Sequence, residues 1–379
     1  MQNILQDILH YSPGMIAFWV LIGALVLHLF YFFFFWIRVP LNKSKAMTNE
    51  LPSVSVIICA RNEDDNLVAN LPSVLAQDYH DFEVVVVNDC SFDNTGDVLE
   101  EFAKKHSHLK IVTIKEDEYY QHGKKVAVMM GVKGSKHECM VMTDADCKPN
   151  SDQWLKQMAG HFANGAEIVV GYGPYKRDKG FLNKLIRFDA FIIGLNYLSF
   201  ALARITYMGV GRNLAYRKKL FYKVKGFASH YHLPSGDDDL FVNEAATSTN
   251  TTVELRSSTF CPSTAKRSFR DWWFQKKRHL ETGKRYKLKH KILLAMQVLA
   301  QWLFFGAFIT ALVLHFQPYV VLGAFVFRLL LQMLIFNSAM RKLQERDLLL
   351  AAPLMELILL IFYPVITISR IFQRKRKWN

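Results

Sequence analysis

The chain has 379 residues, enough for one large domain or two ordinary ones. Hydrophobic residues make up 51% of it and aromatic residues 13%, which are high fractions for a soluble enzyme. Its net charge of +14 is concentrated beside apolar segments, which favours anionic lipid headgroups or a phosphate-bearing ligand, and no further feature indicates nucleic acid. Five scattered cysteines without a CxxC pair indicate neither a disulfide framework nor a zinc site.

The first element in the chain is an apolar run from Gly14 to Ile37, longer than the roughly 20 residues needed to cross a bilayer. Residues 1–13 carry no basic region and no cleavage site follows, so we expect a short N-terminal segment and a transmembrane anchor, not a signal peptide. Arg38 and two lysines follow within a linker over 38–50, and the positive-inside rule puts them in the cytoplasm. We therefore expect an integral membrane protein, as in a bacterial inner membrane, with a cytoplasmic domain after the anchor.

Between residues 51 and 291, short β-rich runs alternate with stretches of helical length. Continuous apolar strands alternating with helices are typical of an α/β domain with a mostly parallel sheet covered on both faces. The expected strands are Val54–Ala60, Phe82–Asp89, Leu109–Ile114, Glu138–Asp146 and Glu167–Gly173, and two of the expected helices are Asn94–His106 and Lys124–Ser135. Ligands bind beyond the carboxyl ends of strands in such sheets, so polar residues there are the candidates for a site.

Acidic residues follow three of these strands, in the segments ARNEDD, NDCSFDNT and TDAD. Asp144 and Asp146 stand two residues apart at an extended strand end, so they should project to the same side. Carboxylates of this kind suit Mg²⁺ or Mn²⁺, which bind one or two carboxylates together with substrate phosphate oxygens. A DxD sequence alone is weak evidence, but its place at the end of a buried strand predicts a metal site.

Two further polar segments are GVGRNLAYRK, over Gly209–Lys218, and SGDDDLF, over Ser235–Phe241. Three consecutive aspartates repel one another unless a cation, solvent or a proton-transfer role compensates. One of them could act as a general base that removes a proton from an attacking hydroxyl. The alternative is the start of a helix, where acidic residues complement the helix dipole.

Taken in order, ICARNEDDNL, VVVVNDCSFDNT, HGKKVAV, MTDADC, GVGRNLAYRK and GDDDL resemble the motifs of glycosyltransferase family 2. The resemblance covers about Val54 to Arg278. It implies a GT-A fold, a nucleoside-diphosphate sugar donor such as a UDP-sugar, a divalent metal, and inversion at the anomeric carbon.

The resemblance also implies roles by position. It places the donor against Ala60, Arg61, Glu63, Asp89, Lys124, Lys125 and Asp144, the metal on Asp146 with Asp144 beside it, and the acceptor or donor sugar against Gly211, Arg212 and Asn213. The position of the general base is ambiguous by one residue. Alignment on the DLF that follows favours Asp237, whereas alignment on a GDD pattern favours Asp238. Gly236 stands where the family usually has an acidic residue.

Membrane-bound members of the family often carry a QxxRW motif, whose Arg serves the diphosphate and whose Trp borders the acceptor. Gln275 and Arg278 match this motif, but His279 stands in place of the Trp, which argues against synthesis of long polymers. Trp272 and Trp273 could border the acceptor instead. We favour a second role for them, as anchors of an interfacial helix over about 265–290.

The segment Phe181–Ile205 predicts either an interfacial helix beside a lipid-acceptor entrance or a buried core helix. Three apolar runs follow within residues 292–372, namely Ile292–Phe316, Pro318–Phe336 and Leu348–Phe372. If all three crossed the membrane, the basic tail over 373–379 would lie outside, against the charge rule. One run is therefore expected to be interfacial or re-entrant.

The sequence thus predicts a membrane-embedded, metal-dependent transferase that moves one sugar from a UDP-sugar to a membrane lipid at the cytoplasmic face. One alternative is a processive polysaccharide synthase. An alternative of another class is a catalytically silent membrane protein that binds a sugar nucleotide.

Overall fold

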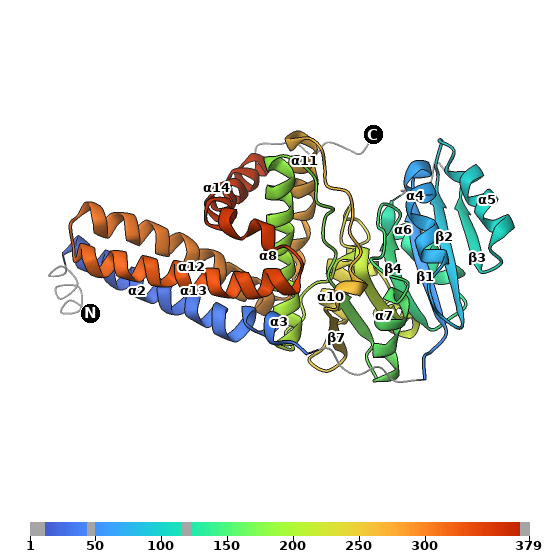
Figure 1. The fold of residues 1–379 in the computed structure, drawn as a ribbon, viewed down its shortest axis with the longest axis horizontal. Coiled ribbons are helices and arrows are strands. Elements are labelled where there is room, and N and C mark those ends of the chain that lie inside the picture. Colours follow the sequence, from blue (N-terminus) through green and yellow to red (C-terminus); the bar gives the residue numbers. More distant parts are fainter. Residues whose placement is uncertain (1–11, 44–49, 116–122, 372–379) are drawn as a thin grey trace.

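The computed structural model describes residues 12–43, 50–115 and 123–371. The predicted tail over 373–379, most of the predicted N-terminal segment and part of the predicted linker lie outside these residues. Figure 1 shows an α/β domain on one side and a bundle of long helices on the other. Between them stands the helix α8 (Phe181–Leu202).

The α/β domain is built on a seven-stranded sheet in the order β3-β2-β1-β4-β6-β5-β7. The strands are β1 (Val54–Ala60), β2 (Phe82–Asp89), β3 (Leu109–Ile114), β4 (Cys139–Asp144), β5 (Ile168–Gly171), β6 (Leu214–Arg217) and β7 (Thr251–Glu254). Strands β1 to β4 pair in parallel, whereas β6 runs antiparallel to both β4 and β5. The mostly parallel sheet is therefore confirmed, and the first three strands have the predicted bounds.

Helices cover both faces of the sheet. They are α4 (Asp64–Leu75), α5 (Thr95–Lys105), α6 (Lys124–Gly134), α7 (Trp154–Ala163), α9 (Lys218–Lys223), α10 (Asp239–Ala245) and α11 (Phe269–His279). Side chains of α4, α5 and α7 pack with Val56 and Ile58 on one face, and side chains of α6, α8 and α10 pack with Ile57 on the other. This double burial explains why the strands are apolar at successive positions.

Three long helices form the bundle. They are α2 (Pro13–Phe30), which continues through η1 (Tyr31–Trp36) into α3 (Arg38–Leu41), α12 (Leu288–Val313) and α13 (Pro318–Lys342). A short 3₁₀ turn, η6 (Arg346–Ala351), leads from α13 into the last helix, α14 (Ala352–Ile371). Among the described residues, five segments could cross a membrane by length and composition, namely Pro13–Leu41, Phe181–Leu202, Leu288–Val313, Pro318–Lys342 and Arg346–Ser369. These helices are those of a membrane protein.

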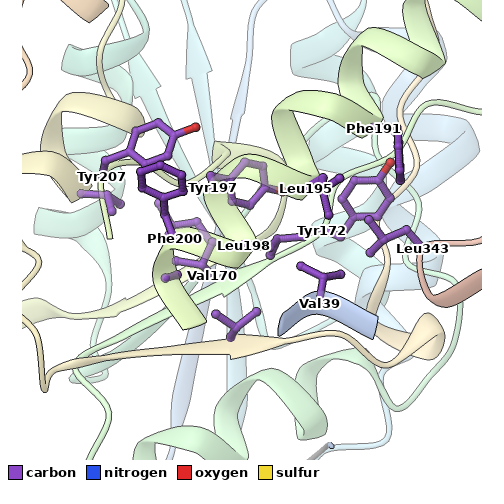
Figure 2. Packing of buried hydrophobic residues seen from close by; sticks show 14 of the residues in the cluster. Val39, Val170, Tyr172, Phe191, Leu195, Tyr197, Leu198, Phe200, Tyr207 and Leu343 are labelled. Atoms are coloured by element: carbon purple, nitrogen blue, oxygen red, sulfur yellow. The ribbon is translucent and has the colours of Figure 1, made fainter. Parts of the chain in front are cut away.

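Helix α8 joins the two parts of the molecule. Figure 2 shows its residues Leu195 and Leu198 in one packed cluster with Val170 and Tyr172 of the sheet side and Val39 of α3. In the apolar 18-residue stretch of α8, 72% is buried inside the protein. This is the burial of a core helix, the second of the two predictions for this segment.

Charged residues inside the apolar helices are paired. Arg328 of α13 is 2% exposed and donates to Glu356 of α14 (Nη1–Oε2 3.1 Å), as expected for charges that face a bundle interior. On α8, Arg187 is also 2% exposed and donates to Glu345 (Nε–Oε2 3.0 Å) and Asp347 (Nη1–Oδ2 2.8 Å) beside η6. These pairs fix α14 and η6 to the rest of the fold.

We expect Arg187→Met to lower the free energy of unfolding by about 3 kcal/mol, because it leaves the buried Glu345 carboxylate without its partner. Thermal unfolding of the detergent-solubilised chain measures the change. Arg177→Gln is the matched control, since the Arg177 side chain is 59% exposed and pairs with the same Asp347. The control should change stability by less than about 1 kcal/mol. Equal losses in both variants would contradict the role assigned to Arg187.

Candidate active site

A small cavity lies at the carboxyl ends of β1 and β4, at the edge of the sheet where the sequence predicts a site. It is lined by Ile57, Cys59, Lys124, Val128, Met142, Thr143, Asp144, Gly211, Leu214, Tyr216, Asp237 and Asp238. The parallel register aligns Cys59 with Asp144, so the ends of these two strands lie level. The loops before β6 and α10 complete the wall. The cavity thus brings together residues of five of the six sequence motifs.

Lys124 lies at the centre of the charges in this cavity. Its Nζ is 2.7 Å from Asp144 Oδ1 and 3.6 Å from Asp237 Oδ2. Burial acts to lower the pKa of Lys124, but the two carboxylates outweigh it and raise that pKa above its ordinary value. Burial likewise acts to raise the pKa of Asp144, and Lys124 with Arg212 outweighs it and lowers that pKa. Lys124 and Asp144 are therefore both charged at neutral pH.

The three consecutive aspartates have different surroundings. Asp237 faces Lys124, whereas Asp238 accepts hydrogen bonds from the backbone N–H of Gly211 (2.8 Å) and of Asp239 (2.7 Å). Asp239 is 8% exposed and accepts from the hydroxyls of Tyr286 (2.8 Å) and Thr282. Asp239 therefore ties the start of α10 to η5 (Thr282–Arg285), and it does not line the cavity.

Asp238 lies in surroundings that disfavour its charged form. Burial, followed by the charges of Asp237 and Asp239, raises the pKa of Asp238 to about 7. Its neighbour Gly236 has a φ of +104°, and a Cβ there would lie 2.6 Å from Leu240 Cδ1. This left-handed turn gives a physical reason for a glycine at a position where the family usually has an acidic residue.

The DxD segment differs from its prediction. Strand β4 ends at Asp144, and Asp146 lies in the turn that follows, so the two side chains do not belong to one extended strand. Possible ligand atoms of Asp144, Asp146 and Cys147 nevertheless lie within 4.8 Å of one another. Ser263 Oγ donates to Asp146 Oδ2 (2.6 Å) and holds that carboxylate at the edge of the site.

The donor atoms of this cluster fit a hard divalent cation. Burial, together with Asp146 and Asp144, raises the pKa of the Cys147 thiol, and sulfur is in any case a soft ligand that hard cations disfavour. The two carboxylates remain as ligands. Two carboxylates with room for phosphate oxygens suit Mg²⁺ or Mn²⁺ better than softer metals.

Four more of the predicted donor-side residues lie at the ends of β1 and β2. Ala60 is the last residue of β1 and pairs with Asn88. Arg61 is exposed, and Glu63 accepts from Asn66 while burial raises its pKa. Asp89 is 4% exposed, and within the described residues its Oδ1 has no hydrogen-bond partner. A buried acceptor of this kind is suited to a ligand N–H or O–H.

Two predicted site residues serve the fold instead. Lys125 is 6% exposed, and its Nζ donates to the carbonyls of His230 (2.5 Å) and Leu233 (3.0 Å), away from the cavity. Burial lowers its pKa to about 8. It therefore supports the loop that carries the aspartates.

Asn213 is fully buried beneath the cavity. Its amide donates to the carbonyls of Tyr172 (2.9 Å) and Thr259 (2.8 Å) and accepts from the indole of Trp154 (3.0 Å). Both polar atoms of its side chain are thus engaged with protein, so it holds the η2 turn (Gly211–Asn213) in place. Gly211 and Arg212 of the same turn do face the site.

Helix α11 contributes the segment related to QxxRW. Arg278 is exposed and is one of the charges that lower the pKa of Asp144, and Gln275 Nε2 donates to the hydroxyl of Tyr175 (3.5 Å). The predicted interfacial role of Trp272 is wrong, because its ring is 0% exposed and stacks on Phe362 of α14 (centroids 4.3 Å apart). Trp273 is partly exposed beside it.

The residues that were not predicted from the sequence include two that contact predicted site residues. Tyr175 lies under the guanidinium of Arg212, whose Cζ is 4.3 Å from the ring centroid, and Ser263 holds Asp146. An isolated β-bridge between Tyr175 and Ser263 brings their two loops together. No motif marks either residue, because the contact depends on loops that are distant in the sequence.

Comparison with known proteins agrees with this architecture. The family model for glycosyl transferase family 2 matches residues 55–225, from β1 to just beyond α9. Over these residues, which are less than half of the chain, the chain is similar to glycosyltransferase family 2. A mannosyltransferase from Pyrobaculum calidifontis, solved with GDP-Man and Mn²⁺, covers 91% of the chain and is itself covered over 99% of its length, with a TM-score of 0.57 at 18% identity. That likeness shows the GT-A fold.

Curated relatives match a third to two fifths of the chain. Glycosyltransferase AglE of Haloferax volcanii is 34% identical over 128 residues, which are 33% of this chain and 40% of that protein. A poly-beta-1,6-N-acetyl-D-glucosamine synthase of Staphylococcus epidermidis is 27% identical over 153 residues, which are 40% of this chain and 34% of that protein. The chain thus spans well under half the length of these relatives.

We expect Asp238→Asn to raise the melting temperature by a few degrees more at pH 8 than at pH 5. The folded-state pKa of Asp238 is about 7, above its unfolded value of 3.8, so the wild-type chain loses stability through this group as pH rises between them. The amide removes that loss. Asp97→Asn, at an exposed position of α5, is the control and should show no such difference. A Tm difference independent of pH would contradict the raised pKa.

Proposed function

We propose that the chain is an inverting glycosyltransferase that moves one sugar from a nucleotide sugar, a UDP-sugar, onto a membrane lipid. The observation that carries the proposal is the position of Lys124, which links Asp144 of the DxD segment to Asp237 of the GDDD segment. A metal-binding carboxylate and a general base must flank the transferred sugar. The two motifs meet at one cavity, as that chemistry requires.

The nucleotide would lie along the ends of β1 and β2. Asp89 Oδ1, buried and without a partner among the described residues, offers an acceptor for a base or ribose. Arg61 and Glu63 stand at the rim beside it. Lys124, Arg212 and Arg278 supply positive charge where a diphosphate would lie, and such groups stabilise the charge that develops on the leaving nucleotide.

Asp146, with Asp144 beside it, would hold a divalent cation. When bound, such a cation supplies Lewis-acid stabilisation of the departing diphosphate. Ser263 fixes the orientation of the Asp146 carboxylate through its 2.6 Å hydrogen bond. The Mn²⁺ in the structure of the Pyrobaculum calidifontis mannosyltransferase supports a metal of this class.

We assign the role of general base to Asp238. A pKa of about 7 lets its carboxylate accept the proton of an acceptor hydroxyl near neutral pH, as that hydroxyl attacks the anomeric carbon from the face opposite the diphosphate. Asp237 then serves chiefly to position Lys124. Asp239 is excluded by its hydrogen bonds to Thr282 and Tyr286.

Membrane geometry supports a lipid acceptor and a cytoplasmic site. No Lys or Arg occurs in residues 12–37 or 292–327, whereas Arg38, Lys43, Lys289 and Lys291 flank the ends of α2 and α12 that adjoin the α/β domain. By the positive-inside rule this end is cytoplasmic. The α/β domain therefore stands next to the cytoplasmic leaflet.

The second candidate is a processive polysaccharide synthase. The match to a poly-beta-1,6-N-acetyl-D-glucosamine synthase favours it. His279, in place of the tryptophan of QxxRW, favours the single-sugar transferase. Product length on a sizing gel separates the two.

The test is nucleotide release and sugar transfer by the detergent-purified chain. We would present UDP- and GDP-sugars, with Mn²⁺ or EDTA, and with or without a membrane lipid extract. We expect release of UDP from one donor, abolished by EDTA and stimulated by lipid, with label in the lipid fraction. Label in a water-soluble polymer would favour the synthase. Nucleotide binding without turnover would favour a silent sugar-nucleotide-binding protein.

Two substitutions test the assigned roles in that assay. Asp146→Asn and Asp238→Asn should each lower kcat by about 100-fold or more, because they remove metal binding and the base respectively. Asp239→Asn is the matched control for the base and should act mainly on stability. The wild-type rate should rise with pH through about 7, as Asp238 loses its proton. A loss of activity confined to Asp237→Asn would move the base to Asp237.

A further inference from the structure

The last helix, α14, carries an apolar stripe that no part of the described chain covers. Its exposed side chains are Leu354 (58% exposed), Leu357 (41%), Ile361 (63%), Val365 (47%) and Ile368 (54%), and Leu350 (93%) extends the stripe into η6. Successive members are three or four residues apart, so they lie along one face of the helix. The stripe is therefore continuous from η6 almost to the end of α14.

The opposite face of α14 is held against protein. Met355 and Ile366 are fully buried, and Phe362 stacks on Trp272 of α11. Tyr363 donates to Asp189 of α8, and Glu356 accepts from Arg328 of α13. These contacts fix which face of α14 points outwards.

The direction of α14 differs from that of the three bundle helices. Figure 1 shows α2, α12 and α13 side by side along the bundle, whereas α14 runs across it at the end that adjoins the α/β domain, beside α8 and α11. If the bundle axis follows the membrane normal, α14 lies close to the membrane plane. Its length and composition alone would allow it to cross.

Positively charged side chains lie near α14, at the end of the bundle that adjoins the α/β domain. Arg177, Arg341 and Arg346 line an open hollow where α13 meets η6, next to the start of the stripe. Lys289 and Lys291 are exposed at the start of α12, at the same end of the bundle. Cations above an apolar face match the headgroups and acyl chains of an anionic leaflet.

We propose that α14 lies in the membrane interface with its apolar stripe in the lipid, so that three helices, α2, α12 and α13, cross the bilayer. The stripe then continues the lipid-facing surface of the bundle. The end of α14 then lies on the same side as the α/β domain, and three C-terminal spans, which conflict with the charge rule, are no longer required. Through Trp272 and Phe362, α14 also fixes α11 at the membrane surface.

Sidedness of the full chain in sealed membrane vesicles tests the proposal without any assay of activity. Three forms of the chain each carry one protease-cleavable tag. The first has the tag after Asn379, and the second has it after Asn164, in the exposed turn before Gly165. The third has it in the turn between α12 and α13. We expect the first two tags to be cleaved under the same conditions and the third under the opposite ones. A C-terminal tag that behaves like the tag between α12 and α13 would show that α14 spans, and would overturn the proposal.

Photo-crosslinking tests the lipid contact directly. Benzoylphenylalanine would replace Ile361 or Leu354 in the full chain, reconstituted in vesicles of phosphatidylethanolamine and phosphatidylglycerol. Ile309 of α12 is the positive control, and Val68 of α4, 55% exposed on the α/β domain, is the negative control. We expect lipid adducts at Ile361, Leu354 and Ile309 and none at Val68. Adducts to a second copy of the chain, or none at α14 while Ile309 reacts, would overturn the lipid contact.

Discussion

The burial of α8 on two sides is the constraint on which the rest of the molecule depends. Its residues pack on the sheet through Val170 and Tyr172 and on the membrane helices through Val39 (Figure 2). An apolar helix with both sides covered gains roughly 25 cal/mol for each Å² removed from water on the sheet side. The α/β domain is thereby fixed at one end of the bundle, and the carboxyl ends of its strands keep a set distance from the membrane.

Pairs of opposite charges hold the side chains in place both in the cavity and beside the long helices. Lys124 holds the carboxylates of Asp144 and Asp237 together, and Arg187 holds Glu345 and Asp347 beside α8. Removing such groups from water is costly unless each charge has a partner. In the cavity, positive charge does not fully compensate the negative charge at Asp238. Its raised pKa therefore leaves a carboxyl group suited to proton transfer.

Most of the sheet and the edge that carries the site could be predicted from the sequence. Strand β1 is apolar at nearly every position because both faces of the sheet are covered, and ARNEDD follows it at once. The ends of α5 and α6 lie within one residue of the predicted ones. Strands β6 and β7 were not predicted, because they are short, are not continuously apolar, and pair with strands that are distant in the sequence.

The sequence by itself determined the apolar anchor, the strand–helix alternation and the motifs of a family 2 transferase, because these are local patterns of residue type. Tertiary structure decided that Lys125 and Asn213 support loops, that Trp272 is buried against Phe362, and that Ser263 reaches Asp146. It also decided the direction of α14, whose composition resembles that of a spanning helix. The physical reason is the same in each case: which face of an element is covered depends on neighbours far away in the chain.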